Sequence, residues 1–369
     1  MSLRTTFRLA VSASVLLALA ACEPDSPVAP DAPDVAGASF ARGGQGQDGL
    51  AVARSAHARN VERMMNNADV AGVGVGRAAN GAGALIVMAR HAAPRGIPSS
   101  IDGVPVIVEV TGDIFAIPAR PSAKPPGTPG GGNGGGGGGG GSAPAPTSFF
   151  NRPVPIGVST GNANECAAGT IGARVSSGSN TYALSNNHVF ARENEGNIGE
   201  TIYQPGRYDL GCATGSQYVL GTLASFQTIK FDGTNNTVDA ALAAVGSNLG
   251  NATTSAGYGV PGSTPVTATV GMAVQKCGRT TNCTTGFVNA VSVTVNVGYS
   301  SGTARFVNQI WIKGSKGAFS KAGDSGSLIV TNDSDASPVG LLFAGGRQDT
   351  FANPIGAVLS ALNVSIDGK

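Results

Sequence analysis

The sequence has little charge and few aromatic residues. Only 12% of its 369 residues are charged, 5% are aromatic, and the formal net charge is +2. That charged share is about half of what soluble domains usually carry. So small a net charge argues against a surface that binds nucleic acid or a highly charged substrate. The abundance of Gly, Ser, Thr, Asn and Val instead favours an extracytoplasmic protein rich in β-strands.

Histidine and cysteine are also scarce. Of the three histidines, only His188 follows the glycine-rich stretch near residue 135, and His57 and His91 are expected to be surface or structural residues. Besides Cys22, the cysteines form an even set that fits export and allows three connectivities: Cys166, Cys212, Cys277 and Cys283. A zinc site is the rival interpretation, but it lacks the C-x2-C spacing and nearby histidines. No metal and no cofactor are therefore expected.

The N-terminus has the pattern of an export signal over residues 1–22. Arg4 and Arg8 precede a short apolar run, which is too short for a transmembrane helix. The run ends in Leu-Ala-Ala-Cys, which resembles a bacterial lipobox and makes Cys22 the expected lipidation site. An ordinary signal peptide is the alternative. Residues 23–46, rich in Pro, Ala, Asp and Gly, have the composition of a disordered tether.

A small α+β domain is expected over residues 47–119. Apolar residues recur at helical spacing over 48–67, and strands are expected at 70–75, 84–88 and 104–110. Residues 120–148 then form a Gly- and Pro-rich linker, which predicts a flexible connection to the remainder of the chain, residues 149–369. The small domain has no evident catalytic group. It is expected to be either a pro-domain that assists the folding of residues 149–369 or blocks their active site, or an independent substrate-binding or anchoring domain.

The most informative segment is Gly323-Asp324-Ser325-Gly326. A serine between glycines can present its hydroxyl and leave nearby N–H groups free for an oxyanion, although the same residues also form ordinary turns. A serine nucleophile needs a base, and His188 is the one histidine available. The base needs an orienting acid, and Asp239 stands alone in an apolar run, where an unpaired carboxylate would be costly.

In the chain order His188, Asp239, Ser325 the three segments resemble the trypsin-like (chymotrypsin-fold) serine peptidases, over about residues 150–369. The resemblance implies that His188 is the general base and acid, Asp239 its orienting carboxylate and Ser325 the nucleophile. The N–H groups of Gly323 and Ser325 would form the oxyanion hole. The sequence departs from the family pattern at Asn187 and Val189, which flank the histidine, and at Ser327, and these departures make specificity harder to infer.

The C-terminal region reads as short strands separated by turns. Strands are expected at 171–175, 181–184, 266–274, 287–297 and 309–312, and a helix at 354–362. This spacing favours a sandwich or a barrel. The resemblance narrows the choice to a mainly β fold of two antiparallel β-barrels with the site between them. Nearest-neighbour pairing of Cys166 with Cys212 and Cys277 with Cys283 would place one disulfide in each barrel.

Substrate contacts follow from the same resemblance. Phe319 would lie at the base of the primary specificity pocket, and Phe343, Ala344 and Gly345 would line it and pair with substrate backbone. No acid is expected there, so an apolar or small residue before the scissile bond is predicted. Arg279 is expected to neutralise Asp324, which would need a partner if buried; the alternative is that Arg279 is a surface residue of a small disulfide loop.

The leading hypothesis is an exported serine endopeptidase that acts on protein or peptide substrates and meets a membrane only through a lipid anchor. Residues 47–119 are expected to contact it within the same chain. Two alternatives stay open: a peptide-binding or adhesion module that keeps the fold without turnover, and an esterase that uses the same triad.

Overall fold

The computed structural model describes residues 44–116 and 144–369. The predicted export signal, Cys22, the tether before residue 44 and most of the linker lie outside the described residues. Within the described part of the chain, no helix is both long and apolar enough to cross a membrane.

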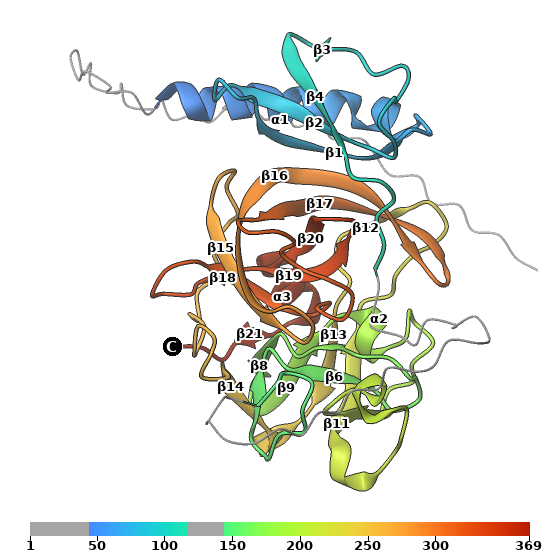
Figure 1. Cartoon of the computed structure of the whole chain (residues 1–369), viewed down its shortest axis with the longest axis vertical. Coiled ribbons are helices and arrows are strands. Elements are labelled where there is room, and N and C mark those ends of the chain that lie inside the picture. Colours follow the sequence, from blue (N-terminus) through green and yellow to red (C-terminus); the bar gives the residue numbers. More distant parts are fainter. Residues whose placement is uncertain (1–43, 117–143) are drawn as a thin grey trace, which may run out of the picture. The chain divides into compact units, whose positions relative to one another are not determined.

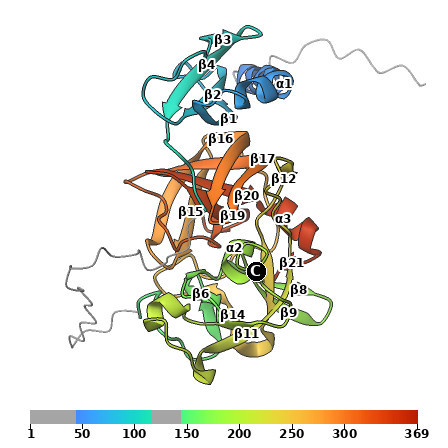
Figure 2. The ribbon, with the colours of Figure 1, turned by 90° about the vertical axis from the view of Figure 1, so that its right-hand side faces the viewer.

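The first described region is a helix packed on a small sheet, as Figures 1 and 2 show. Its elements are α1 (Gly44–Met65), β1 (Val70–Arg77), β2 (Gly83–Ala89), β3 (Ser100–Ile101) and β4 (Val104–Val110). Strand β2 lies between β1, its antiparallel neighbour, and β4, its parallel neighbour. The apolar positions of α1, such as Ala53 and Met64, are buried with Val73 and Leu85 of the sheet. The expected helix and three strands are confirmed.

The first barrel is a curled sheet of eight strands. Its order is β21-β8-β9-β13-β11-β10-β6-β7. The bounds are β6 (Ser159–Asn162), β7 (Gly169–Thr170), β8 (Ala173–Ser177), β9 (Asn180–Ser185), β10 (Thr201–Tyr203), β11 (Val219–Phe226), β13 (Ala241–Ala244) and β21 (Ser365–Ile366). Strands β5 (Val154–Ile156) and β14 (Leu249–Thr253) pair separately, and the short strand β12 (Asn235–Asn236) pairs with the second barrel. Short helices are α2 (Asn187–Phe190), η1 (Arg207–Leu210), η2 (Ser216–Tyr218) and η3 (Gly246–Asn248).

The second barrel closes on itself through six strands. They are β15 (Ala273–Gly278), β16 (Asn282–Tyr299), β17 (Gly302–Gly314), β18 (Leu328–Thr331), β19 (Pro338–Gly345) and β20 (Asp349–Pro354), followed by α3 (Ile355–Leu362). The ring of antiparallel pairs runs β15-β16-β17-β20-β19-β18 and returns to β15. The mainly β fold of two antiparallel barrels is thus confirmed.

Two details of the predicted elements can be compared with the structure. Disulfides join Cys166 to Cys212 and Cys277 to Cys283, one in each barrel, as the nearest-neighbour pairing implies. The strand expected at 266–274 is wrong over most of its length, because β15 begins only at Ala273. The N–H of Met272 bonds to the carbonyl of Thr269, so the chain turns there instead of extending.

The N-terminal sheet is continuous with the second barrel. Strand β1 pairs antiparallel with β16, with Gly72 opposite Val295 and Val75 opposite Val291. Glycines alternate along β1, and a Cβ atom on Gly74 would lie 2.8 Å from a methyl group of Val293. The close approach of β1 to β16 therefore depends on the missing side chain at this position.

Candidate active site

His188 and Asp239 are brought together by the pairing of two strands of the first barrel. In the antiparallel β9 and β13 pair, Ser185 lies opposite Ala241. The residues just after β9 therefore lie beside those just before β13. His188 Nδ1 is 2.6 Å from Asp239 Oδ2, and the His188 backbone N–H donates to Asp239 Oδ1 at 3.2 Å. Both side chains are fully buried.

The backbone and carboxylate of Asp239 are also fixed from outside this pair. The Asn186 side-chain amide donates to the Asp239 carbonyl at 2.7 Å, and the Asp239 N–H donates to Asn353 Oδ1 at 3.0 Å. The Tyr299 hydroxyl donates to Asp239 Oδ2 at 3.0 Å. Among the described residues, His188 Nε2 is buried without a hydrogen-bond partner. The imidazole is thus oriented through one nitrogen, and the other is left available.

Ser325 lies on a tight loop before β18. Gly323 and Gly326 both have φ of +94°, a conformation that favours glycine on each side of the serine. The loop is bonded to the first barrel, because the Thr170 N–H donates to the Ser325 carbonyl at 2.8 Å. Ser185, at the end of the strand that leads to His188, donates to the Thr170 carbonyl at 2.8 Å. Ser325 is therefore linked through two contacts to the segment that carries the histidine.

The same loop leaves the N–H groups of Gly323 and Ser325 without a bond to the loop's own carbonyl groups. Thr280 Oγ1 donates to the Ala322 carbonyl at 2.7 Å, and Ser327 donates to the Asp324 carbonyl through both its N–H and its hydroxyl. In a trans peptide the N–H points opposite the carbonyl. The N–H groups of Gly323 and Ser325 therefore face away from these contacts. Neither donates to a protein acceptor among the described residues, as an oxyanion hole requires.

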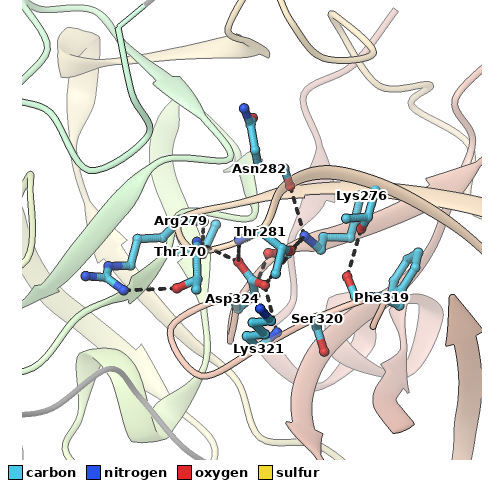
Figure 3. A network of polar contacts seen from close by, with 12 residues as sticks. Thr170, Lys276, Arg279, Thr281, Asn282, Phe319, Ser320, Lys321 and Asp324 are labelled. Atoms are coloured by element: carbon cyan, nitrogen blue, oxygen red, sulfur yellow. Dashed lines mark hydrogen bonds and ion pairs between the residues drawn. The ribbon is translucent and has the colours of Figure 1, made fainter. Parts of the chain in front are cut away.

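Asp324 is buried beneath this loop, and its cationic partner is Lys276 rather than Arg279. Lys276 Nζ lies 3.6 Å from Asp324 Oδ2, and both side chains are fully buried (Figure 3). The Arg279 guanidinium instead bonds to Asp209, one contact being 2.9 Å. The prediction that Arg279 is the partner was wrong. The residues that follow Arg279 nevertheless help to neutralise Asp324. The N–H groups of Thr280 and Thr281 donate to Asp324 Oδ1 at 2.8 and 3.1 Å.

A cavity of about 60 Å³ lies beside Ser325. It is lined by Phe115, Ser320, Lys321, Ala322, Ser325, Leu342, Ala344, Gly345 and Gly346. The predicted contacts Ala344 and Gly345 are thus placed next to the serine. Phe319 and Phe343 do not line this cavity: each belongs to a hydrophobic core and is fully buried.

Residues 114–116 occupy the edge of β19 next to this cavity. The Phe115 N–H donates to the Gly345 carbonyl at 3.0 Å, and the Gly345 N–H donates to the Phe115 carbonyl at 2.9 Å. On the other side, the Ala116 N–H donates to the Gly298 carbonyl at 3.1 Å, and the Gly298 N–H to the Ile114 carbonyl at 2.9 Å. Sequence reasoning missed this segment, which bridges to Gly345 and Gly298 at Phe115; its one signal was the apolar run that directly precedes the linker.

The two barrels, with the His188–Asp239 pair in one and the Ser325 loop in the other, define a trypsin-like protease fold. Similar solved structures include a glutamic acid-specific serine protease (22% identity, TM-score 0.41) and Thermobifida fusca protease A (20%, 0.42). A third is Cellulomonas bogoriensis chymotrypsin (21%, 0.41). Each match covers 58% of this chain and 99–100% of the other.

Comparison with sequence families gives a shorter match. The model of the family described as the Nal1 C-terminal domain matches residues 221–352, a range that contains Asp239 and Ser325 but not His188. No curated protein matches the chain.

Proposed function

We propose that this chain is a serine endopeptidase in which Ser325 is the nucleophile, His188 the general base and acid, and Asp239 the orienting carboxylate. The observation that carries the proposal is the buried His188–Asp239 contact of 2.6 Å, with Nε2 left without a partner among the described residues. A base held at one nitrogen and free at the other is what a serine nucleophile requires.

The chemistry follows from these positions. Ser325 Oγ attacks the scissile carbonyl carbon while His188 Nε2 takes the hydroxyl proton. The new oxyanion accepts hydrogen bonds from the N–H groups of Gly323 and Ser325. The imidazolium then gives its proton to the leaving amine, and an acyl-enzyme remains. Water, deprotonated by the same nitrogen, attacks the ester and releases the acid, which restores Ser325.

Residues 44–116 act as an inhibitory pro-domain in this proposal. The paired hydrogen bonds between Phe115 and Gly345 are those an extended substrate would form on the edge of β19. His188 is fully buried and Ser325 is 3% exposed while the segment is bound. A substrate must therefore displace residues 114–116, or they must leave after cleavage of the chain, before the serine can be reached.

The proposal places the protein outside the cytoplasm, with Cys22 as the site of a lipid anchor. Two disulfides fit an oxidising compartment. The lipid is tested by metabolic labelling with an alkyne fatty acid: wild-type chain should be labelled, and Cys22→Ala should not. Equal labelling of both would remove the anchor from the proposal.

A fluorophosphonate probe tests the catalytic assignment, because it bonds covalently to an activated serine much faster than to an ordinary hydroxyl group. We expect labelling of the full chain that Ser325→Ala abolishes. Replacing His188 by Ala should lower kcat by about 10^4- to 10^6-fold, because triad members act as a unit. Asp239→Asn should be nearly as damaging, since it favours the wrong imidazole tautomer.

Latency is tested with Phe115→Pro and its matched control Phe115→Ala. Proline removes the N–H that bonds to Gly345, so labelling and peptide hydrolysis should rise. Alanine keeps both backbone hydrogen bonds and should stay close to wild type. Absence of serine labelling in all of these chains would favour the peptide-binding module, whereas labelling with turnover of esters alone would favour the esterase.

A further inference from the structure

Tyr299 contacts the His188–Asp239 pair from a distant part of the chain. It is the last residue of β16, at the tip of the β16–β17 hairpin, where it lies opposite Gly302. Its hydroxyl donates to Asp239 Oδ2 at 3.0 Å, the same oxygen that lies 2.6 Å from His188 Nδ1. Its ring lies edge-on to the imidazole, with centroids 6.0 Å apart. Tyr299, which belongs to the second barrel, thus adds a third member to the His188–Asp239 pair of the first barrel.

The hydroxyl of Tyr299 serves this carboxylate as a donor. Burial raises its pKa well above the ordinary value, and the negative charge of Asp239 raises it further. The phenol therefore stays protonated across the pH range in which a peptidase works. A protonated phenol beside a carboxylate can only stabilise the ionised acid by donating to it.

The hairpin tip is itself anchored to the loop that follows His188. Glu193 accepts the backbone N–H groups of Ser300 and Ser301, at 3.3 and 2.8 Å. The Tyr299 ring also contacts Phe231 and Phe306, with centroids 5.6 and 6.2 Å away. The phenol is thus aimed at Asp239 by its backbone and by its ring. Glu193 is the other charged group that acts on this hydroxyl.

We propose that Tyr299 is a positioning residue: its phenol fixes the Asp239 carboxylate in the orientation that holds His188, and sets how much negative charge that carboxylate presents to the imidazole. This inference rests on the proposed function, because it assigns a role in the same reaction. Tyr299 acts through Asp239 and is not assigned a contact with substrate.

Removing this hydroxyl has a definite consequence. Without the donor, Asp239 Oδ2 carries more unshared negative charge and favours the imidazolium over the neutral imidazole. The base is then protonated up to a higher pH. The acid limb of the kcat/KM profile should move to higher pH by about half to one unit, since one lost hydrogen bond amounts to about that shift.

The first measurement uses Tyr299→Phe in the full chain and does not depend on turnover. Histidine labelled with 15N reports the imidazole titration, with the His188 signal assigned by its loss in His188→Gln. The titration midpoint should move to higher pH in Tyr299→Phe. It should stay in place in Tyr182→Phe, which removes a hydroxyl from strand β9. Glu193→Gln measures how much the other facing charge contributes.

The second measurement is kinetic and uses the Phe115→Pro chain, in which the site is opened. Adding Tyr299→Phe should lower kcat by about tenfold with KM unchanged, because a hydrogen bond to a charged group is lost and the substrate edge is intact. An unmoved imidazole titration and pH profile in Tyr299→Phe would overturn the positioning role even if Ser325 is labelled. If Ser325 is not labelled but the His188 titration moves in Tyr299→Phe, the peptidase function would be rejected, whereas the effect of Tyr299 on the His188–Asp239 pair would stand.

Discussion

The buried carboxylate of Asp324 is compensated by one cation and four hydrogen-bond donors. Besides Lys276, the donors are the N–H groups of Thr280, Thr281 and Lys321 and the hydroxyl of Thr281. Lys276 is itself fully buried. Burial lowers its pKa, and the neighbouring Asp324 opposes that change. Since Asp324 precedes Ser325, the pair supports the loop that presents the nucleophile and the two free N–H groups.

Lys276→Met should destabilise the protein and disorder this loop. The substitution keeps an apolar chain of similar length but leaves Asp324 as a buried charge without a cation. Breaking a buried pair in this way costs about 3–5 kcal/mol, which urea denaturation would measure. Fluorophosphonate labelling of Ser325 should fall in parallel.

Two further variants test whether the loss of the Lys276 charge causes the lower stability of Lys276→Met. Lys230→Met, at an exposed position, should leave stability and labelling close to wild type. Adding Asp324→Asn to Lys276→Met should recover part of the lost stability, because no buried charge remains. A double variant no more stable than Lys276→Met alone would contradict the electrostatic explanation.

Strand pairing explains why part of the site could be predicted from sequence and part could not. His188, Asp239 and Ser325 stand in short segments whose residue types carry their chemistry, and the β9–β13 register then brings the first two together. Lys276 and Tyr299 reach the site from β15 and β16 and carry no local signal. Phe319 and Phe343 both lie in the cores. Phe319 does so although it follows the segment Gly-Ser-Lys-Gly-Ala, whose residues favour a surface position.

The packing of α1 on β1 should weaken in acid because of His57. His57 Nε2 lies 3.2 Å from the Val73 carbonyl, and the side chain is buried. Burial lowers its pKa below the ordinary 6.5; the contact with Val73 opposes this change, and nearby Arg54 adds to it. The unfolded segment therefore binds more protons than the folded one. The stability of this packing is full above about pH 6.5 and falls as the pH drops below that value.

Hydrogen exchange of the β1 and β2 amides tests this prediction. Protection in the wild-type chain should be lower at pH 5 than at pH 7.5. His57→Gln keeps a side-chain donor without titrating in this range, so the difference between the two pH values should shrink. His91→Gln removes a half-exposed histidine that pairs with Asp69 and should leave the difference in place. An unchanged difference in His57→Gln would assign the acid effect to other groups.

The N-terminal sheet and the second barrel share one set of backbone hydrogen bonds across β1 and β16. Barrels built from non-local pairs fold slowly, because loop-closure entropy is lost before contacts compensate for it. Strand β1 offers the edge of a small sheet to β16, which pairs with both β15 and β17 in the second barrel. A sheet already folded in residues 70–110 could therefore act as a template for the β16–β17 hairpin and also hold residues 114–116 on the edge of β19.

Gly74→Val tests whether this pairing both assists folding and keeps the site closed. The new Cβ would lie 2.8 Å from a methyl group of Val293 and 3.2 Å from Cβ of Ala290. Such overpacking costs about 1–3 kcal/mol, and it falls on the junction rather than inside either barrel. Refolding from urea should be slower and give less native protein, which is measured in the Ser325→Ala background to prevent self-cleavage.

Where Ser325 is kept, the natively folded fraction of Gly74→Val should label faster with fluorophosphonate, because residues 114–116 are held less firmly. Gly356→Val is the matched control, since a Cβ there meets nothing within 4 Å. Refolding and labelling of Gly74→Val that both equal this control would show that the N-terminal sheet neither templates nor closes the peptidase.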